Sequence, residues 1–400
     1  MVAVTGIGVI SPHGDDPDRM FEALMRGESA VHPVFPQLAR PAAAATLIFD
    51  ESRWFTKLQL PGVDRVSQIA VAAASQAVAD AGALDAAPER IGVYAGCGMG
   101  GAGALEAAYA AGLRGGRVPP LTVPAFMPNA PAAHVAMRHG VHGPVLTYSV
   151  ACASSAVALA EAARAVRRGD VDVAIAGGAE ALIVPGVVSA WQALQTLASP
   201  ADGEAASACK PFAANRSGFV LGEGAAFLVL ESAQRAQHRG ARVHGRLAGS
   251  GLSCDATHLT KPDSAGQQRA LRAALADAGV AAGDIGYCNA HGTATPIGDV
   301  VECDALRAVW GDAIDGLWVS STKALHGHLL GAAGALEAVV TLLALREQRL
   351  PPNAHCESPD PRCAVRLVLQ PLSSAERLNA AISSSFAFGG TNTVLVFKRA

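Results

Sequence analysis

Charged residues are scarce in this sequence: they make up 16% of its 400 residues, and the formal net charge is only −3. Without an excess of lysine and arginine, the chain lacks the broad basic surface that binds nucleic acid or anionic membranes. Half of the residues are hydrophobic, so a large core is expected and extensive disorder is not. A chain of this length forms one large domain or two of average size.

The sequence also lacks a hydrophobic run suited to crossing a membrane. The segment MVAVTGIGVISP at the N-terminus has no basic residue before its short apolar run, which favours a first strand over a secretion signal. The apolar tract at 329–345 contains Glu337, which favours a buried helix over a membrane span. We therefore expect no membrane association and a cytoplasmic location.

A third absence concerns the eight cysteines, none of which shows CxxC spacing. Their scatter fits a reducing compartment better than a disulfide framework or a zinc site. The pair His326-Gly-His328 could suggest a metal, but no third ligand follows at a recognisable spacing. The sequence therefore predicts no bound metal.

Apolar runs of strand length alternate with alanine-rich helical runs along most of the chain. This alternation predicts an α/β layer architecture. The Pro/Gly-rich piece at 113–126 is expected to run over the surface. The clearest strand candidates are 91–98, 172–181, 224–232 and 392–398, and the clearest helix candidates are 67–82 and 266–279.

The two halves of the sequence carry a weak repeat. A strand, Cys152 and an apolar helix in the first half correspond to a strand, His328 and an apolar helix in the second. The offset between these two residues is 328 − 152 = 176 positions. We therefore predict two similar halves, 1–240 and 241–400, whose central helices begin close together at a pseudo-twofold axis. The alternative is that alanine-rich helices resemble one another by composition alone.

Cys152 lies in VACASSA (150–156), between a strand-like run and a helical run, among very small side chains. A thiol at a helix N-terminus experiences the positive end of the helix dipole and free backbone N–H groups, which lower its pKa. The small neighbours would let a substrate carbonyl approach. Cys152 is therefore a candidate nucleophile, with a buried structural cysteine as the alternative.

Two further stretches contain histidines in settings suited to catalysis. In NAHGTATPIGD (289–299), His291 follows a short strand and precedes an irregular loop, where Thr293 and Thr295 could bind an amide-rich ligand arm. In SSTKALHGHLLGAAGALEAV (320–339), Lys323 lies near His326 and His328 and would keep these two imidazoles neutral. A buried Glu337 needs a partner, and Lys323 is the candidate.

The stretch SSFAFGGTN (384–392) contains the pair Gly389-Gly390. Two glycines allow a tight turn with free N–H groups, which could supply one half of an oxyanion hole. This evidence is weak by itself.

Together and in this order, these stretches resemble the elongating β-ketoacyl-acyl carrier protein synthases of fatty-acid and polyketide synthesis. The resemblance runs from 4–12 to 389–397 and includes KPFAANRSGFVLGEGAAFLVLE at 210–231. It implies the thiolase fold, in which two duplicated α/β halves form a five-layer αβαβα arrangement, usually as a homodimer. A heterodimer is the other possibility.

The resemblance also implies a role for each matching residue. Cys152 would be acylated, His291 and His328 would be the catalytic histidines, and Lys323 and Glu337 would complete the catalytic set. The backbone N–H of the gating Phe388 would join that of Cys152 in the oxyanion hole. The implied substrate-binding residues are Thr293 and Thr295 for the phosphopantetheine arm, Leu105 in the acyl pocket, and Phe386 and Gly389.

Three departures from the family pattern stand out. His326 replaces a residue that is commonly threonine or another small one, and we expect it among the groups that contact the substrate. Ala387 replaces the usual glycine between two phenylalanines and is expected to stiffen the gating loop. The stretch LASPAD (197–202) lacks an arginine that many relatives use for carrier docking. Candidate basic contacts for an acidic carrier are Arg53, Lys57, Arg65, Arg114 and Arg117.

The implied reaction is a decarboxylative Claisen condensation of malonyl-acyl carrier protein with an acyl group on Cys152. The expected partners are the acyl carrier protein and acyl and malonyl thioesters; no cofactor is expected, because phosphopantetheine arrives on the carrier. A thiolase would need a second cysteine near the C-terminus, and an initiating synthase would use one histidine and an asparagine. A non-catalytic chain-length partner would lack the nucleophile, and this chain keeps Cys152.

Overall fold

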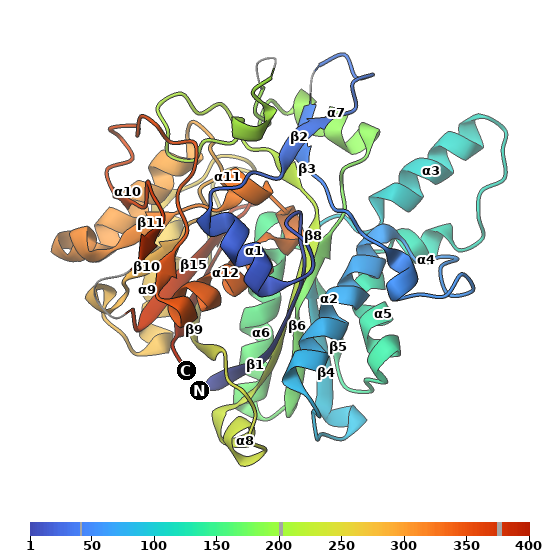
Figure 1. The fold of residues 1–400 in the computed structure, drawn as a ribbon, viewed down its shortest axis with the longest axis horizontal. Coiled ribbons are helices and arrows are strands. Elements are labelled where there is room, and N and C mark those ends of the chain that lie inside the picture. Colours follow the sequence, from blue (N-terminus) through green and yellow to red (C-terminus); the bar gives the residue numbers. More distant parts are fainter. Residues whose placement is uncertain (41, 200–202, 374–377) are drawn as a thin grey trace.

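The computed structural model describes residues 1–40, 42–199, 203–373 and 378–400. Within these residues the main feature is an 11-stranded sheet that runs through both halves of the chain (Figure 1). Its strand order is β13-β11-β10-β15-β16-β9-β1-β8-β6-β4-β5. The strands of the first half are β1 (Val2–Ile10), β4 (Ile91–Gly96), β5 (Val145–Tyr148), β6 (Val173–Glu180) and β8 (Gly224–Ser232). Those of the second half are β9 (Gly245–Cys254), β10 (Tyr287–Asn289), β11 (Trp318–Ser320), β13 (Arg366–Leu367), β15 (Ala380–Phe386) and β16 (Thr391–Lys398).

The two halves of this sheet share one topology. The order β1-β8-β6-β4-β5 in the first half corresponds to β9-β16-β15-β10-β11 in the second. In both, the first three strands pair antiparallel and the last three pair parallel. The halves meet where β1 pairs antiparallel with β9. The predicted duplication is therefore confirmed as a feature of the fold.

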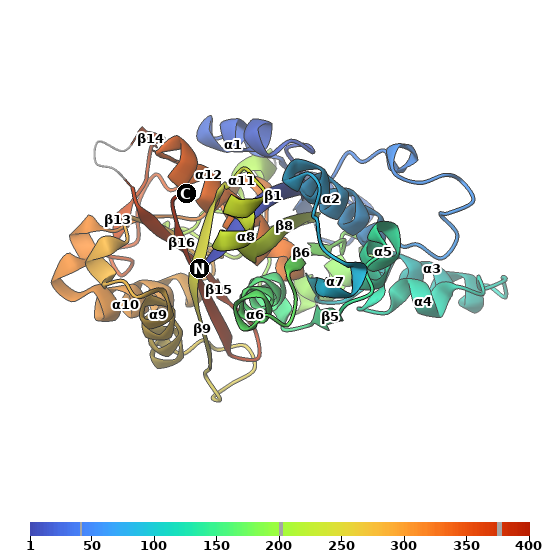
Figure 2. The same ribbon diagram turned by 90° about the horizontal axis from the view of Figure 1, so that it is seen from below.

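Helices separate and cover the two halves of the sheet. The central layer consists of α6 and α12, which pack against each other and against strands of both halves. Helices α2 and α5 cover one outer face, and α9 and α10 cover the other (Figures 1 and 2). This gives the five-layer thiolase arrangement. These helices are α2 (Arg65–Ala81), α5 (Ala130–His139), α6 (Ser154–Arg168), α9 (Ser264–Ala278), α10 (Gly298–Trp310) and α12 (Ala333–Glu347).

The composition of α12 explains its central position. Every residue from Ala333 to Leu345 is buried, as expected for a helix that is apolar on all sides. Its N-terminus meets that of α6, where the backbone N–H of Ala335 donates to the hydroxyl of Ser155 at 2.9 Å. Small residues at both helix starts allow this approach, so the predicted meeting of the two central helices is confirmed.

The remaining elements lie around this core. Two small sheets contain β2 (Val31–Val34), β3 (Ala42–Ala45) and β7 (Leu221–Gly222), and β12 (Arg349–Leu350) with β14 (Leu372–Ser373). The other helices are α1 (Pro17–Met25), α3 (Ala102–Leu113), α4 (Thr122–Phe126), α7 (Pro185–Ala193), α8 (Ala233–His238) and α11 (Lys323–His326). The predicted surface excursion at 113–126 lies mostly exposed between α3 and the end of α4. None of the helices in the described residues has both the length and the hydrophobicity needed to span a bilayer.

Candidate active site

Cys152 lies in a 3₁₀ turn, Ala151–Ala153, directly before α6. Ala151 adopts a left-handed φ of 49°, which turns the chain sharply from β5 into the helix. The neighbouring strand β4 passes so close that a Cβ on Gly96 would lie 2.2 Å from the backbone nitrogen of Ser155. The expected position between a strand and a helix is therefore present, and Cys152 is 7% exposed.

His291 is held by a carboxylate that the sequence analysis did not identify. The backbone N–H groups of His291 and Gly292 each donate to Glu302 of α10, at 2.8 Å. The imidazole Nδ1 is buried without a protein partner. Glu302 thus fixes the loop after β10 and leaves the ring free to face the site.

His328 is held through its backbone and one ring nitrogen. Its N–H donates to the carbonyl of Val220 at 2.7 Å, and its carbonyl accepts from Gly222 at 2.9 Å. The backbone N–H of Leu330 donates to Nδ1 at 3.3 Å. Because Nδ1 accepts, the neutral ring carries its proton on Nε2, which is buried without a protein partner. His328 therefore presents an N–H donor to the site.

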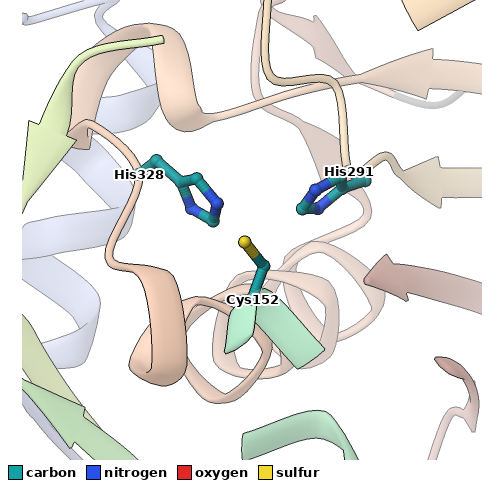
Figure 3. A group of neighbouring side chains, drawn as sticks. All are labelled: Cys152, His291 and His328. Carbon is teal, nitrogen blue, oxygen red and sulfur yellow. The ribbon is translucent and has the colours of Figure 1, made fainter. Parts of the chain in front are cut away.

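The three side chains point toward one another (Figure 3). The sulfur of Cys152 and one nitrogen each from His291 and His328 lie within 4.8 Å of one another. The two imidazoles are edge to face, with centroids 5.4 Å apart and planes at 82°. A thiol and two histidines also have the chemistry of a zinc-ligand set. The nucleophile comes from the first half of the chain and both histidines come from the second.

The buried environment keeps both imidazoles neutral. Burial, followed by the charge of Lys323, lowers the pKa of His291 and of His328 well below its usual range. The sequence analysis expected this direction for His328 from Lys323, but burial contributes more. Each histidine can therefore donate or accept a hydrogen bond without carrying a positive charge.

The pKa of Cys152 differs from the sequence-based expectation. Burial raises the pKa of this thiol to about 12, although Lys323 and the backbone N–H groups of Phe388 and Cys152 act in the opposite direction. The expected stabilising groups are thus present, but desolvation outweighs them. The prediction of a lowered pKa in the free enzyme was wrong, because a fully buried sulfur is costly to ionise before a substrate is present.

Lys323 and Glu337 form a buried ion pair behind the site. Both side chains are fully buried and in direct contact, which confirms the predicted partnership. Burial raises the pKa of Glu337 to about 7, and Lys323 opposes this shift. The pair places a positive charge near Cys152 and both histidines, and it influences all three pKa values.

The loop after β15 brings the backbone of Phe388 to the sulfur. Gly389 and Gly390 have φ values of 87° and 81°, so the predicted tight turn is present. The prediction that both glycines expose free N–H groups was wrong: Gly389 donates to the carbonyl of Leu259 and Gly390 to that of Ala387. The N–H that faces Cys152 belongs to Phe388.

A cavity of about 370 Å³ leads to Cys152. Its lining includes both histidines, Thr293, Thr295, Phe386, Ala387 and Phe388. The hydroxyls of Thr293 and Thr295 lie 3.1 Å apart. Gly389 is not part of the lining, and Leu105 lies in α3, away from this cavity. The structure therefore brings together the predicted threonines and Phe386, but it does not place Leu105 or Gly389 on the cavity wall.

An aromatic stack forms one wall of the cavity and was not predicted. Trp191 of α7 lies 6.1 Å from Phe388 and 5.5 Å from Phe219, measured between ring centroids. Phe219 in turn lies 5.3 Å from His328. A single tryptophan in a short helix carries no sequence signal for such a role, since its neighbours come from distant segments.

The candidate docking cations lie apart from the cavity. Arg53 pairs with Asp15 and Arg65 with Glu223, and none of the five candidates lines the cavity. The lysine that does so is Lys261. The stretch LASPAD ends in residues 200–202, which lie outside the described residues.

His326 does not line the cavity. It is fully buried, with hydrogen bonds to the hydroxyl of Thr322 and the carbonyl of Gly327. The expectation that it contacts the substrate was wrong, because the turn after α11 directs it away from the sulfur while His328 faces it.

Glu180 is a second carboxylate that the sequence analysis did not identify. It accepts hydrogen bonds from the backbone N–H groups of Gly98 and Met99 in the first half and of Gly331 in the second. Burial raises its pKa to about 7. A glutamate at the end of an apolar strand, in GGAEA, was the available signal. Glu180 thereby joins the two halves of the chain.

Sequence comparisons identify relatives over the length of the chain. The family described as "Beta-ketoacyl synthase, N-terminal domain" matches residues 1–236, and "Beta-ketoacyl synthase, C-terminal domain" matches residues 244–357. A 3-oxoacyl-[acyl-carrier-protein] synthase 2 from Staphylococcus aureus strain N315 is 37% identical over 408 residues, which cover 100% of this chain and 98% of that protein.

Structural comparison gives the same result. A β-ketoacyl synthase from Burkholderia phymatum STM815 superposes with a TM-score of 0.91 at 34% identity, over 100% of this chain and 99% of that one. A type II polyketide ketosynthase, solved with its acyl-carrier protein and bound to the hexaketide, superposes with a TM-score of 0.91 at 28% identity. This match also covers 100% of this chain and 99% of that one.

Proposed function

Because the chain belongs to the β-ketoacyl synthase family and is an acyltransferase of the condensing type, we propose the following roles for its residues. Cys152 accepts an acyl group from a carrier thioester, and malonyl-acyl carrier protein then condenses with it. The product is a β-ketoacyl chain longer by two carbons. The observation that carries this proposal is the convergence of one sulfur and two histidine nitrogens within 4.8 Å at the cavity.

The first half-reaction transfers the acyl group to Cys152. The sulfur attacks the thioester carbonyl, the C–S bond to the carrier arm breaks, and the carrier thiol leaves. The oxyanion formed on the way is stabilised by the backbone N–H groups of Cys152 and Phe388, both of which face the sulfur. Lys323 also favours the thiolate, so ionisation is coupled to substrate binding rather than complete beforehand.

The second half-reaction uses the two neutral histidines. The malonyl thioester carbonyl accepts hydrogen bonds from His328 Nε2–H and from His291. The bond to the carboxylate breaks, carbon dioxide leaves, and the electron pair forms an enolate that these donors stabilise. The enolate carbon attacks the acyl carbonyl on Cys152, a C–C bond forms, and the C–S bond breaks to return the thiolate. Decarboxylation supplies the driving force, so no strong base is required.

Two further groups of residues assist the reaction: one sets the electrostatic potential at the reacting atoms, and the other binds the carrier arm. Lys323 and Glu337 set the electrostatic potential at the sulfur and the imidazoles. Thr293 and Thr295 line the cavity and present hydroxyls to the amides of the phosphopantetheine arm. Lys261 lies on the same lining and suits the phosphate at the outer end of that arm.

The partners that we propose are the acyl carrier protein and a second copy of the chain. The sheet ends in β5, where Val145 and Leu146 are 39% and 45% exposed. An open edge strand with exposed apolar side chains is suited to pairing with another strand. In α3, Tyr109 and Leu113 are also exposed apolar side chains. A homodimer accounts for both features, and a heterodimer is the alternative.

We further propose a cytoplasmic enzyme that needs neither metal nor redox cofactor, since phosphopantetheine arrives on the carrier. Fatty-acid elongation is the plain choice of pathway. A dedicated polyene or polyketide pathway is the alternative, favoured slightly by the departures at His326 and Ala387. The acyl-chain length accepted by Cys152 distinguishes these pathways.

Intact-mass spectrometry tests the proposed nucleophile. The protein is incubated with acyl carrier proteins loaded with chains of different lengths. We expect an acyl adduct in the wild type and in Cys209→Ala, because Cys209 is also buried but does not line the cavity. Cys152→Ala should form none. An adduct on folded Cys152→Ala, or no adduct on wild type with any chain, would contradict the proposal.

A further inference from the structure

His326 has no direct access to the substrate, but it contacts the backbone that positions His328. Its Nδ1 lies 2.7 Å from the carbonyl oxygen of Gly327, and its Nε2 lies 2.9 Å from the hydroxyl of Thr322. A carbonyl oxygen only accepts, so Nδ1 carries the proton and Nε2 accepts from Thr322. Both ring nitrogens are therefore satisfied in one tautomer and one orientation.

The peptide bond between Gly327 and His328 is held at both ends. Its N–H, on His328, donates to the carbonyl of Val220 at 2.7 Å. Its carbonyl, on Gly327, receives the His326 ring N–H. Gly327 has a φ of 69°, and a Cβ there would lie 2.8 Å from the carbonyl oxygen of Leu221. Without these contacts, the flexibility of Gly327 would let the plane of the Gly327–His328 peptide rotate. The two opposed hydrogen bonds fix the orientation of that plane.

The same contacts connect the two catalytic histidines. Thr322 also lies 3.5 Å from the side-chain nitrogen of Asn289, a weak contact. Asn289 ends β10, two residues before His291. A chain of buried polar groups thus runs from the strand that precedes His291 to the peptide that precedes His328. The relative position of the two rings, 5.4 Å between centroids, depends on both ends of this chain.

We propose that His326 is a positioning residue for His328, because its Nδ1–H fixes the Gly327–His328 peptide so that Nε2 of His328 faces the sulfur of Cys152. Burial lowers the pKa of His326 to about 3, so the neutral ring persists at physiological pH. The inference rests on the proposed function. It predicts that His326 matters most for malonyl decarboxylation, in which both histidines act together, and less for acylation of Cys152.

Two amide variants separate the two contacts of the ring. In His326→Asn the side-chain NH₂ takes the place of Nδ1 and can still donate to Gly327. In His326→Gln the amide takes the place of Nε2 and reaches Thr322 instead. We expect His326→Gln to lower the kcat of malonyl-carrier decarboxylation roughly 10- to 100-fold, and His326→Asn to stay within about threefold of wild type. The KM for malonyl-carrier and the acylation of Cys152 should change little in both.

The results distinguish a positioning role of His326 from a packing role, and they also distinguish failure of this proposal from failure of the proposed function. Equal losses in the two variants, or equal retention, would overturn the positioning role, as would losses that simply follow a lowered Tm. A wild type without decarboxylase activity would instead contradict the proposed function. Selective ¹⁵N-histidine labelling of wild type provides a test that needs no folded variant. We expect His326 in the Nδ1–H tautomer, and an Nε2–H tautomer overturns the proposal.

Discussion

The two central helices begin with the same backbone conformation but carry different functional groups. Ala151 and Leu330 have left-handed φ values of 49° and 46°, and each is the first residue of a 3₁₀ turn that leads into a 15-residue helix. Each helix then ends at a left-handed residue, Gly169 or Gln348. The offset is constant: 330 − 151 = 179 and 348 − 169 = 179.

This offset corrects the sequence-based pairing of Cys152 with His328. At 152 + 179 = 331, the structural counterpart of Cys152 is Gly331. A Cβ on Gly331 would lie 2.4 Å from a carboxylate oxygen of Glu180. In the first half this position therefore carries the proposed nucleophile. In the second half the missing side chain leaves space for the carboxylate of Glu180. Duplication supplied two equivalent helix starts, and only one of them carries a reactive group.

The two central helices also differ in how they accommodate a glutamate, and this difference gives the largest expected effect. Glu337 of α12 pairs with Lys323 at full burial, whereas Glu161 of α6 pairs with Arg164 at partial exposure. Removing one partner of a buried pair leaves an uncompensated charge and typically costs about 3–5 kcal/mol. An exposed pair is worth about 0.3–0.5 kcal/mol. We expect Glu337→Ala to lower the free energy of unfolding by about 3–5 kcal/mol, and Glu161→Ala by less than about 1 kcal/mol.

Urea denaturation of both variants provides the measurement. Equal destabilisation by the two substitutions would contradict the distinction between the helices. So would a more stable Glu337→Ala.

The second-largest expected effect concerns the two half-reactions, acylation and condensation, to which the two halves of the chain contribute different residues. Cys152 comes from the first half and His328 from the second, so each half-reaction depends on them differently. We expect His328→Ala to lower condensation about 10²- to 10³-fold, the typical loss for one oxyanion donor. Acylation of Cys152 should fall much less, because Phe388 and Cys152 provide the N–H groups for that step.

Single-turnover assays that follow acyl transfer and condensation separately measure this difference. Cys209→Ala serves as a control for changes in a buried residue outside the cavity. Comparable losses of His328→Ala in both half-reactions would count against the assignment of roles.

Local patterns in the sequence predicted the fold because each element carries its own signal. The strands at β4, β6, β8 and β16 and helices such as α2 follow directly from hydrophobic periodicity. The thiol and two histidines were identifiable from motifs, and the structure brings them together. The predicted boundary at residue 240 and the catalytic roles of individual residues stay predictions.

Properties that depend on the packing of distant segments could not be predicted. Desolvation sets the pKa of Cys152, and its size depends on segments hundreds of positions away. Glu180 accepts from the backbone N–H of Gly331, 151 positions away, and Glu302 accepts from that of His291 in the preceding loop. Periodicity reveals neither contact. The direction of His326, two residues before His328, depends on the turn at Gly327 rather than on spacing.

A substitution at the structural counterpart of Cys152 gives a smaller effect. Gly331→Ala places a Cβ 2.4 Å from a Glu180 oxygen and 2.5 Å from the backbone nitrogen of Gly98. Overpacking of this kind costs about 2–3 kcal/mol. Gly283→Ala is the matched control, since its Cβ would meet only Ala313 at 3.7 Å, and we expect a change within about 0.5 kcal/mol. Thermal unfolding of both variants measures the difference, and a Tm of Gly331→Ala equal to that of Gly283→Ala would contradict it.

The smallest effect is a pH dependence that originates at the contact between the halves. Burial raises the pKa of Glu180 to about 7 from its usual value of 4.5. Between pH 4.5 and 7, Glu180 is therefore protonated in the folded state and ionised in the unfolded state. The contribution of Glu180 is fully present below about pH 4.5 and is lost as the pH rises through about 7.

Glu180→Gln removes this titration, so the stability of wild type relative to the variant should fall by about 1–2 kcal/mol between pH 5 and 7. Denaturant unfolding at several pH values measures that difference. A difference that stays constant or rises with pH for Glu180→Gln would mean that the folded protein keeps this carboxyl ionised. The three backbone N–H donors from both halves would then outweigh its burial, and the contact between the halves would resemble an anion site rather than a protonated acid.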